Sequence, residues 1–164
     1  MSAYITLMTP MTNQEFILAA LTDMGFQRDQ IEVHAEPVQL VGYGGERRAQ
    51  TANIVIRRRH VGTASNDLGL LATPTGYQLQ VSDYDRHQYG DDWVRRLHDR
   101  YRHHETIAQE RLAEAERRRL EEERRQLVEA QRLGVLARAK QLGYQVKETR
   151  EGDTVRLVLL KRTY

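Results

Sequence analysis

The sequence predicts an α+β fold, in which a mainly antiparallel sheet carries helices on one face and a long charged helical arm is added. Segments with strand patterns and helix patterns alternate along the chain, and one helix–glycine–aromatic–strand pattern occurs near both ends. The run RLAEAERRRLEEERRQLVEAQRLG at residues 111–134 is about half charged and contains no proline. Helices packed on one face of an antiparallel sheet bury the apolar side of both elements.

The N-terminal segment predicts one strand followed by one helix. Tyr4 to Met8 has a mixed alternating pattern that suits a mostly buried strand, which Pro10 ends. Thr12-Asn13-Gln14-Glu15 has the spacing of a capping box and places Thr12 at the N-cap of the helix. Helical spacing then gives the helix one apolar face, formed by Phe16, Ile17, Ala20, Leu21 and Met24.

The middle of the chain predicts a group of strands joined by turns. Pro37 lies between two of them and favours an edge strand or a bend. Gly42 to Gly45 predicts a turn, and Pro74-Thr75-Gly76 between two apolar runs predicts a hairpin. The predicted strands are residues 31–34, 38–41, 51–59, 68–73 and 77–84.

A second helix follows, for which Asp91 or Asp92 provides the cap. No glycine or proline occurs from Asp91 to Leu133, so the helix can continue as one rod of roughly 65 Å, at ~1.5 Å per residue. The alternative is a helical hairpin, but the sequence shows no turn residue there. We favour the rod, with Gly134 as a hinge or kink. The helix begins with an apolar face made of Trp93, Val94, Leu97 and Tyr101.

The C-terminal segment repeats the N-terminal pattern. ILAALTDMGFQ at residues 17–27 aligns in character with VLARAKQLGYQ at residues 135–145, and each contains a glycine that fits the left-handed residue after a helix. Two strands are then predicted at 144–149 and 154–161. Such a repeat resembles ferredoxin-like α+β folds. We expect both helices to pack on one sheet, in the same chain or in a partner, through Phe16, Ile17, Leu21, Met24, Leu136, Ala139 and Leu142.

The charged arm is neutral as a whole, because residues 101–133 contain eight Arg and eight Glu. Its i,i+4 pairs stabilise an exposed helix by ~0.3–0.5 kcal/mol each. Equal numbers of Glu disfavour nucleic-acid binding by the arm, since they repel phosphate. We predict ion pairs between Glu114 and Arg118 and between Glu121 and Arg125.

A seven-residue repeat offers a second interpretation of the arm. Ala113, Leu120 and Leu127 recur every seven residues, which is the spacing of a self-associating seam. A stable coiled coil needs a second apolar position in each heptad, and charged residues occupy it here. A solvated helix held by its own ion pairs is therefore the favoured interpretation, and self-association through these three residues is the alternative.

Composition excludes several classes of protein. The 164 residues fit one domain with an appendage, and 40% hydrophobic residues suffice for one moderate core. The absence of cysteine excludes disulfides and thiolate-ligated metals and fits a cytoplasmic protein. No run is long and apolar enough for a membrane span, and the N-terminus has no basic signal-peptide region. The net charge of +2 is only mildly basic.

Five arginines form the one candidate patch for nucleic acid. They lie on neighbouring predicted strand segments with only Glu46 nearby in sequence, and Tyr43 adds an aromatic ring for RNA or DNA. Alternation along a strand would put Arg57 and Arg59 on one face, opposite Arg58. The favoured alternative is an exposed, charged edge strand that resists aggregation. The arginines are Arg47, Arg48, Arg57, Arg58 and Arg59.

No pattern predicts catalysis. The turn at Gly42–Gly45 lacks the lysine and spacing of a phosphate-binding loop. Adjacent helical residues face about 100° apart, so His103 and His104 cannot both share a face with His98. We therefore expect no catalytic residue, no metal site and no cofactor.

Four stretches resemble the family of hypothetical chloroplast reading frame 35, a domain of unknown function. They are VGYGGERR at 41–48, TANIVIRRRHVGTASNDLGL at 51–70, RYRHH at 100–104 and QLGYQVKETREGDTVRLVLL at 141–160. The resemblance covers most of residues 1–104 and 134–164 and implies no catalytic residue. It implies work inside an assembly with an AAA-type ATPase, because such domains are often encoded beside one.

Together these observations predict a non-enzymatic interaction or adaptor protein within a larger assembly. Residues 1–104 and 134–164 would form the α+β core, and residues 105–133 the arm inserted before the last helix–strand unit. A straight arm would separate the last strands from their own core, so we expect a homodimer that exchanges its C-terminal units. The alternative function is a nucleic-acid-binding module that uses the arginines at 47–59. A third, weaker option is an enzyme of unrecognised type.

Overall fold

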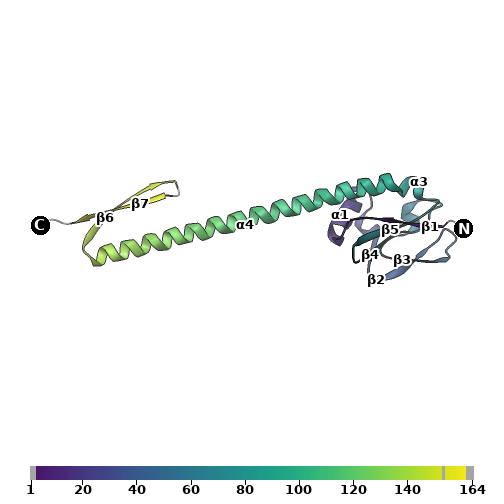
Figure 1. Cartoon of the computed structure of the whole chain (residues 1–164), viewed down its shortest axis with the longest axis horizontal. Coiled ribbons are helices and arrows are strands. Elements are labelled where there is room, and N and C mark those ends of the chain that lie inside the picture. The colour runs from purple at the N-terminus through teal and green to yellow at the C-terminus, as the bar shows by residue number, and fades with distance from the viewer. Residues whose placement is uncertain (1–2, 153, 162–164) are drawn as a thin grey trace. The chain divides into compact units, whose positions relative to one another are not determined.

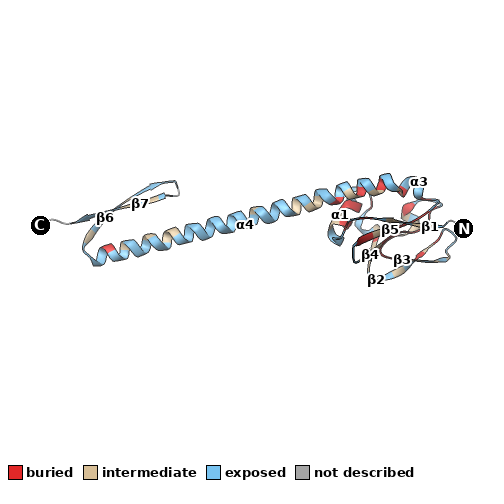
Figure 2. Cartoon of the chain, viewed as in Figure 1, coloured by how far each residue is buried: buried red, intermediate tan, exposed pale blue. Residues whose placement is uncertain are grey.

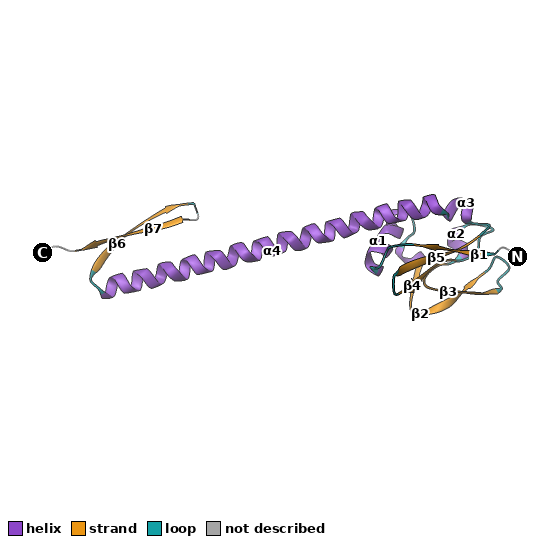
Figure 3. Cartoon of the chain, in the orientation of Figure 1, coloured by secondary structure: helices purple, strands orange, loops and turns teal. Residues whose placement is uncertain are grey.

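The structure, a computed structural model, describes residues 3–152 and 154–161. It confirms the α+β class, with a five-stranded antiparallel sheet and a separate two-stranded sheet (Figures 1 and 3). The chain divides into two compact units, Met1–Ala108 and Gln109–Tyr164. A single helix, α4 (Asp91–Gln141), begins in the first unit and ends in the second.

The first unit contains the five-stranded sheet and the helices that cover it. Its strand order is β1-β5-β4-β3-β2. Strands β2 to β5 are therefore neighbours in chain order, and β1 forms the other edge beside β5. The elements before α4 are β1 (Tyr4–Met8), α1 (Gln14–Asp23), a 3₁₀ turn (Arg28–Gln30), β2 (Ile31–Val41), β3 (Arg47–Ile56), α2 (Arg58–Val61), β4 (Leu68–Thr73), β5 (Gly76–Ser82) and α3 (Arg86–Tyr89).

One row of apolar side chains runs across the sheet and positions the core. Leu7 lies opposite Leu79, Leu79 opposite Leu70, and Leu70 opposite Ile54. Directly opposed residues share a face of an antiparallel sheet, so this row forms one continuous apolar surface. The predicted hairpin of β4 and β5 is confirmed, and β2 is an edge strand whose register shifts between Val33 and Val38, around Pro37.

Helix α1 ends as the sequence predicts but begins one residue later than expected. The N-cap is Asn13, not Thr12, because the Asn13 Oδ1 accepts hydrogen bonds from the backbone N–H groups of Glu15 (2.9 Å) and Phe16 (3.3 Å). At the other end Gly25 has φ 104°, and the Phe26 N–H donates to the Leu21 carbonyl. This is the Schellman arrangement expected of a glycine there.

The start of α4 completes the core over the same face of the sheet. Trp93, Leu97 and Tyr101 are buried with Ile17 and Leu21 of α1 in one apolar cluster, as the helical spacing predicts. The Tyr101 ring packs edge-on against Phe16 at 5.8 Å. Its hydroxyl accepts hydrogen bonds from the backbone N–H groups of Thr12 and Asn13, and so ties α4 to the start of α1.

Helix α4 is unbroken over 51 residues, so the predicted continuous helix is confirmed and the helical hairpin is wrong. Both predicted ion pairs form, at 2.9 Å between Glu114 and Arg118 and 2.9 Å between Glu121 and Arg125. The helix passes through Gly134 and ends before Gly143, whose φ of 75° confirms the predicted left-handed residue.

The last two strands form a sheet of their own. β6 (Tyr144–Glu151) and β7 (Thr154–Lys161) pair only with each other among the described residues. Among the described residues, the buried cluster that contains α1 does not include Leu136, Ala139 or Leu142. Trp93, Leu97 and Tyr101 instead pack beside α1, on the helix-covered face where we expected the three C-terminal residues. The two halves of the sequence repeat thus lie in different sheets, unlike the halves of a ferredoxin-like repeat.

The helices that the structure describes do not include a candidate membrane span. None of them combines the length and the hydropathy that crossing a bilayer requires.

Candidate functional site

The predicted arginines flank β3: Arg47 and Arg48 begin this strand, and the run at 57–59 follows its end. Hydrogen bonds bring the β2–β3 turn against the connection from β3 to β4. β3 ends at Ile56, one residue before the basic run, and Arg58–Val61 form the short helix α2. The predicted alternation of Arg57 and Arg59 against Arg58 therefore does not occur, because these residues do not lie on a strand.

Arg57 is held by two carboxylates. Its guanidinium donates to Glu32 at 2.8 Å through Nε and to Asp67 at 2.9 Å through Nη1. The hydrogen bond from Arg57 is the main cause that lowers the pKa of Glu32. The same bond, together with the bond that Arg57 donates to Asp67, raises the pKa of Arg57. Arg57 thus stabilises the fold and does not offer a cation to solvent.

Asp67 joins the end of β2 to the residues that follow β3. Its side chain is 1% exposed and accepts three hydrogen bonds, from the backbone N–H groups of Val41 (2.9 Å) and Arg58 (2.8 Å) and from Arg57. Its backbone carbonyl accepts a further bond from the Tyr4 hydroxyl at 2.8 Å. Burial, and then the negative charge of Asp67, raises the pKa of Tyr4 well above its ordinary value.

Asn66, the neighbouring residue, connects three loops. Its side-chain amide donates to Ser82 (2.9 Å) and Asp85 (3.2 Å), and its Oδ1 accepts from the backbone N–H of Tyr43 at 3.0 Å. Ser82 in turn donates to Asp85 at 2.5 Å. These bonds fix the β2–β3 turn against the connection between β3 and β4, so both loops have a defined position.

Two more arginines are committed to the same loops. The Arg58 guanidinium donates to the backbone carbonyls of Gly42, at 3.2 Å, and Tyr43. Arg48 pairs with Glu46 at 2.7 Å and lies over the ring of Tyr4, 5.9 Å from its centroid. Its Nε is buried with no hydrogen-bond partner.

The remaining predicted residues are exposed. Arg47 and Arg59 face solvent, and the Tyr43 side chain is 60% exposed. Tyr43 separates two open hollows of about 620 Å³ each. Arg59 and His60 line one, and Glu46 and Tyr84 line the other.

Sequence reasoning missed Asn66, Asp67 and Asp85, which carry this network. They belong to short polar runs beside buried strands, and such runs in a single sequence predict exposed turns. The one local signal was the Asn66-Asp67 pair immediately before the apolar strand at Leu68.

The second candidate surface is the C-terminal unit, which has almost no core. Ala139 is its only buried residue among those described, whereas the first unit has a large buried cluster (Figure 2). A hollow of about 310 Å³ remains between α4 and the β6–β7 hairpin. Exposed large apolar residues are concentrated in this unit: Leu112, Leu120, Leu127, Leu133, Val135, Leu142, Val158, Leu159 and Leu160.

The hairpin is held on α4 mainly by charge. Arg132 of α4 donates to both carboxylate oxygens of Glu148 on β6, with a shortest distance of 2.7 Å, and also contacts Glu129 at 2.6 Å. The bond from Arg132 lowers the pKa of Glu148. Val146 and Leu157 on the helix-facing side are only half buried, so little apolar surface is removed from water there.

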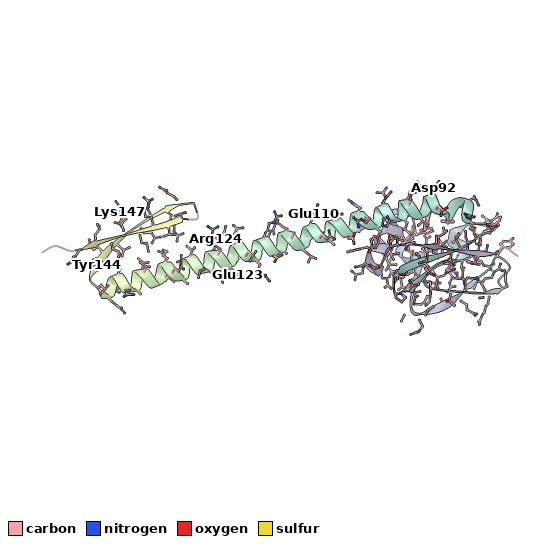
Figure 4. The ribbon with its side chains drawn as sticks, in the orientation of Figure 1. Asp92, Glu110, Glu123, Arg124, Tyr144 and Lys147 are labelled. Carbon is pink, nitrogen blue, oxygen red and sulfur yellow. The ribbon has the colours of Figure 1, made fainter. Side chains whose placement is uncertain are left out.

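The predicted seam of Ala113, Leu120 and Leu127 is exposed along α4, with Leu120 at 52% and Leu127 at 59%. Figure 4 labels Glu110, Glu123 and Arg124, whose charged side chains project outward from the same helix. The seam is therefore available to a partner, but charged residues surround it. Its role in self-association stays a prediction.

The histidines lie apart from any cluster of possible metal ligands. His104 contacts Asp23 at 2.8 Å, and His98 stacks on Tyr101. In the part of the chain that the structure describes, no three His, Asp or Glu residues are grouped to hold a metal ion.

Comparisons of the chain with models of protein families, with curated proteins and with solved structures found no match.

Proposed function

We propose that the protein is a non-enzymatic interaction protein whose C-terminal unit is completed by a second protein chain. The observation that carries the proposal is the contrast, in the described part of that unit, between one buried residue and many exposed apolar residues. A two-stranded hairpin is at best marginally stable in water without further strands or a packed apolar face. The unit thus gains stability by association.

The outer edge of β7 is the place where association gains most. Its backbone groups on that side have no strand partner among the described residues, and an open edge is a template for another strand. The sequence TVRLVLLK contains two charged residues and no proline, so little in it opposes pairing. Val158, Leu159 and Leu160 are each more than 40% exposed and would be covered.

A second copy of this chain is the partner that fits this edge. Two β7 strands paired antiparallel about Val158 would give a four-stranded sheet with two-fold symmetry, the commonest symmetry of protein dimers. This register sets Leu157 against Leu159 of the other copy. It also sets Arg156 against Leu160, so like charges are not directly opposed. This arrangement replaces exchange onto the first unit, whose helix-covered face is already occupied.

The first unit would then serve as the adaptor part of the protein. Its core is complete within one chain, so a dimer displays it twice on a charged helix. The resemblance to the hypothetical chloroplast reading frame 35 family suggests an AAA-type ATPase as the larger assembly, in the cytoplasm. Multivalent display increases the avidity of such a contact without any new interface.

Single cysteines test the β7 contact directly, because the chain has no cysteine of its own. Val158→Cys should form a disulfide-linked dimer under mild oxidation, since opposed Cβ atoms in a sheet lie within disulfide reach. Leu112→Cys, at a 72% exposed position on α4, is the matched control and should stay monomeric on a denaturing gel. Arg156→Cys checks the register and should also stay unlinked. Equal, slow linking of all three variants would contradict the proposal.

A further inference from the structure

Of the two hollows beside Tyr43, the one lined by Arg59 and His60 has features of a ligand site that the proposed assembly role does not use. It is called the hollow beside Tyr43 below. Its volume is about 620 Å³, and it lies between the β2–β3 turn and the connection from β3 to β4. The bonds of Asn66 and Arg58 to the turn fix both walls. A site held in this way requires little reorganisation on binding, which favours affinity.

The charge of the hollow is positive. Arg58, Arg59 and His60 line it, and no carboxylate does so among the described residues. Arg58 donates to backbone carbonyls, so no opposite charge neutralises it. Arg59 is exposed, and its Nε donates to the ring of His60 at 2.9 Å. The hydroxyls of Thr63 and Ser65 add further hydrogen-bonding groups. Such a set favours an anion with several oxygens.

Tyr43 supplies an aromatic surface at the same place. Glycines flank it on both sides, and Gly45 has φ 87°, a conformation that other residues rarely adopt. Neighbouring side chains in the turn therefore do not cover the ring, which is 60% exposed. An exposed ring beside a basic hollow is the combination that binds single-stranded nucleic acid, with a base stacked on the ring and its phosphate on the cations.

We propose that the hollow beside Tyr43 binds one nucleotide of a single-stranded nucleic acid. The base stacks on Tyr43, and the phosphate contacts Arg59 and Arg58. The earlier candidate patch is reduced to these residues, because Arg57 and Arg48 are bound to Asp67, Glu32 and Glu46. Double-stranded DNA is excluded as the preferred ligand, since its bases are stacked on each other and cannot reach the ring.

Fluorescence anisotropy with labelled single-stranded RNA and DNA of one sequence tests the proposal on the full chain. Tyr43→Ala should weaken binding about five-fold or more, whereas Tyr43→Phe, which keeps the ring, should not. Arg59→Gln should weaken binding and reduce the salt slope by about 0.7. Arg100→Gln removes the same charge from an exposed position on α4 and should change little.

Several results would overturn the inference. They are no binding at low salt, equal affinity of wild type and Tyr43→Ala, or equal losses in Arg59→Gln and Arg100→Gln. A nucleoside monophosphate that binds as tightly as the strand would show a free-nucleotide site instead. A duplex that competes as well as the strand would remove the stacking role of Tyr43. Circular dichroism of each variant confirms that the fold is retained.

Discussion

At the scale of single residues, one buried carboxylate holds the end of β2 against the residues that follow β3. Asp67 accepts hydrogen bonds from two backbone N–H groups and from Arg57. Without this carboxylate the two N–H groups lose their acceptor, which costs about 1–3 kcal/mol each, whereas Arg57 keeps its ion pair with Glu32. The loops around Tyr43 depend on this interaction for their position.

We expect Asp67→Ala to lower the free energy of unfolding by about 2–5 kcal/mol, because two backbone N–H groups lose their acceptor. Urea denaturation of the first unit measures this loss. Asp83→Ala, at an exposed position in the neighbouring β5–α3 connection, is the control and should change it by less than about 0.5 kcal/mol. If both variants behaved alike, Asp67 would not hold these loops together.

Glu32 should make the stability of the fold depend on pH. Its pKa lies below the ordinary value of 4.5, first because Arg57 donates to it and also because of His34. A carboxylate with a lowered pKa stabilises the fold fully above its unfolded value, and this contribution is lost as the pH falls through the folded value.

Glu32→Gln should therefore be less stable than wild type near neutral pH. The difference should shrink as the pH drops below about 4.5. Urea midpoints collected across the acid range measure this difference. A gap between wild type and variant that stayed constant down to the lowest pH would show that the Glu32 charge contributes nothing.

At the scale of elements, helix α1 is stabilised by burial and α4 beyond the first unit by its own charges. Leu21 has no exposed surface, whereas Leu112 is 72% exposed. Leu21→Ala should cost ~2–5 kcal/mol, and Leu112→Ala should cost less than about 0.5 kcal/mol. Thermal or urea unfolding followed by Trp93 fluorescence reports on the first unit. An equally small loss at both positions would mean that α1 is not part of the core.

Periodicity predicted these elements because each is determined by local pattern. The apolar spacing of α1 and the start of α4, the β4–β5 hairpin and the glycines at 25 and 143 all follow from nearby sequence. The N-cap of α1 was shifted by one residue because Thr12 and Asn13 are both good caps. The strand at 51–59 was extended too far, since nothing local shows that Asp67 binds the Arg58 backbone and so favours the turn of α2.

The candidate site was harder to predict than the fold. Tyr43 and Arg59 stay candidates, because the structure leaves both side chains exposed as the sequence predicts. Arg57 was counted with them, because its partners Glu32 and Asp67 are distant in the chain or separated by a loop. Arg48 was counted too, although its partner Glu46 is only two residues away. A sequence shows that an arginine is charged, but only the fold shows whether a carboxylate already neutralises it.

At the scale of the whole molecule, the two units differ in what stabilises them. The first has a complete apolar cluster, and the second has one buried residue among those described and an ion pair between Arg132 and Glu148. The two copies of the sequence repeat therefore differ in burial. The copy near residue 17 packs in a core, and the copy near residue 135 has Leu142 exposed.

Light scattering coupled to size-exclusion chromatography, at several micromolar concentrations, tests this central claim most directly. The intact chain should have the mass of a dimer, and Val158→Lys should have the 19.1 kDa mass of one chain because it places two like charges opposite each other in the β7 pair. Leu112→Lys, on α4, should remain dimeric. A monomeric wild type throughout this range, or a Val158→Lys variant that is still dimeric, would contradict association through β7.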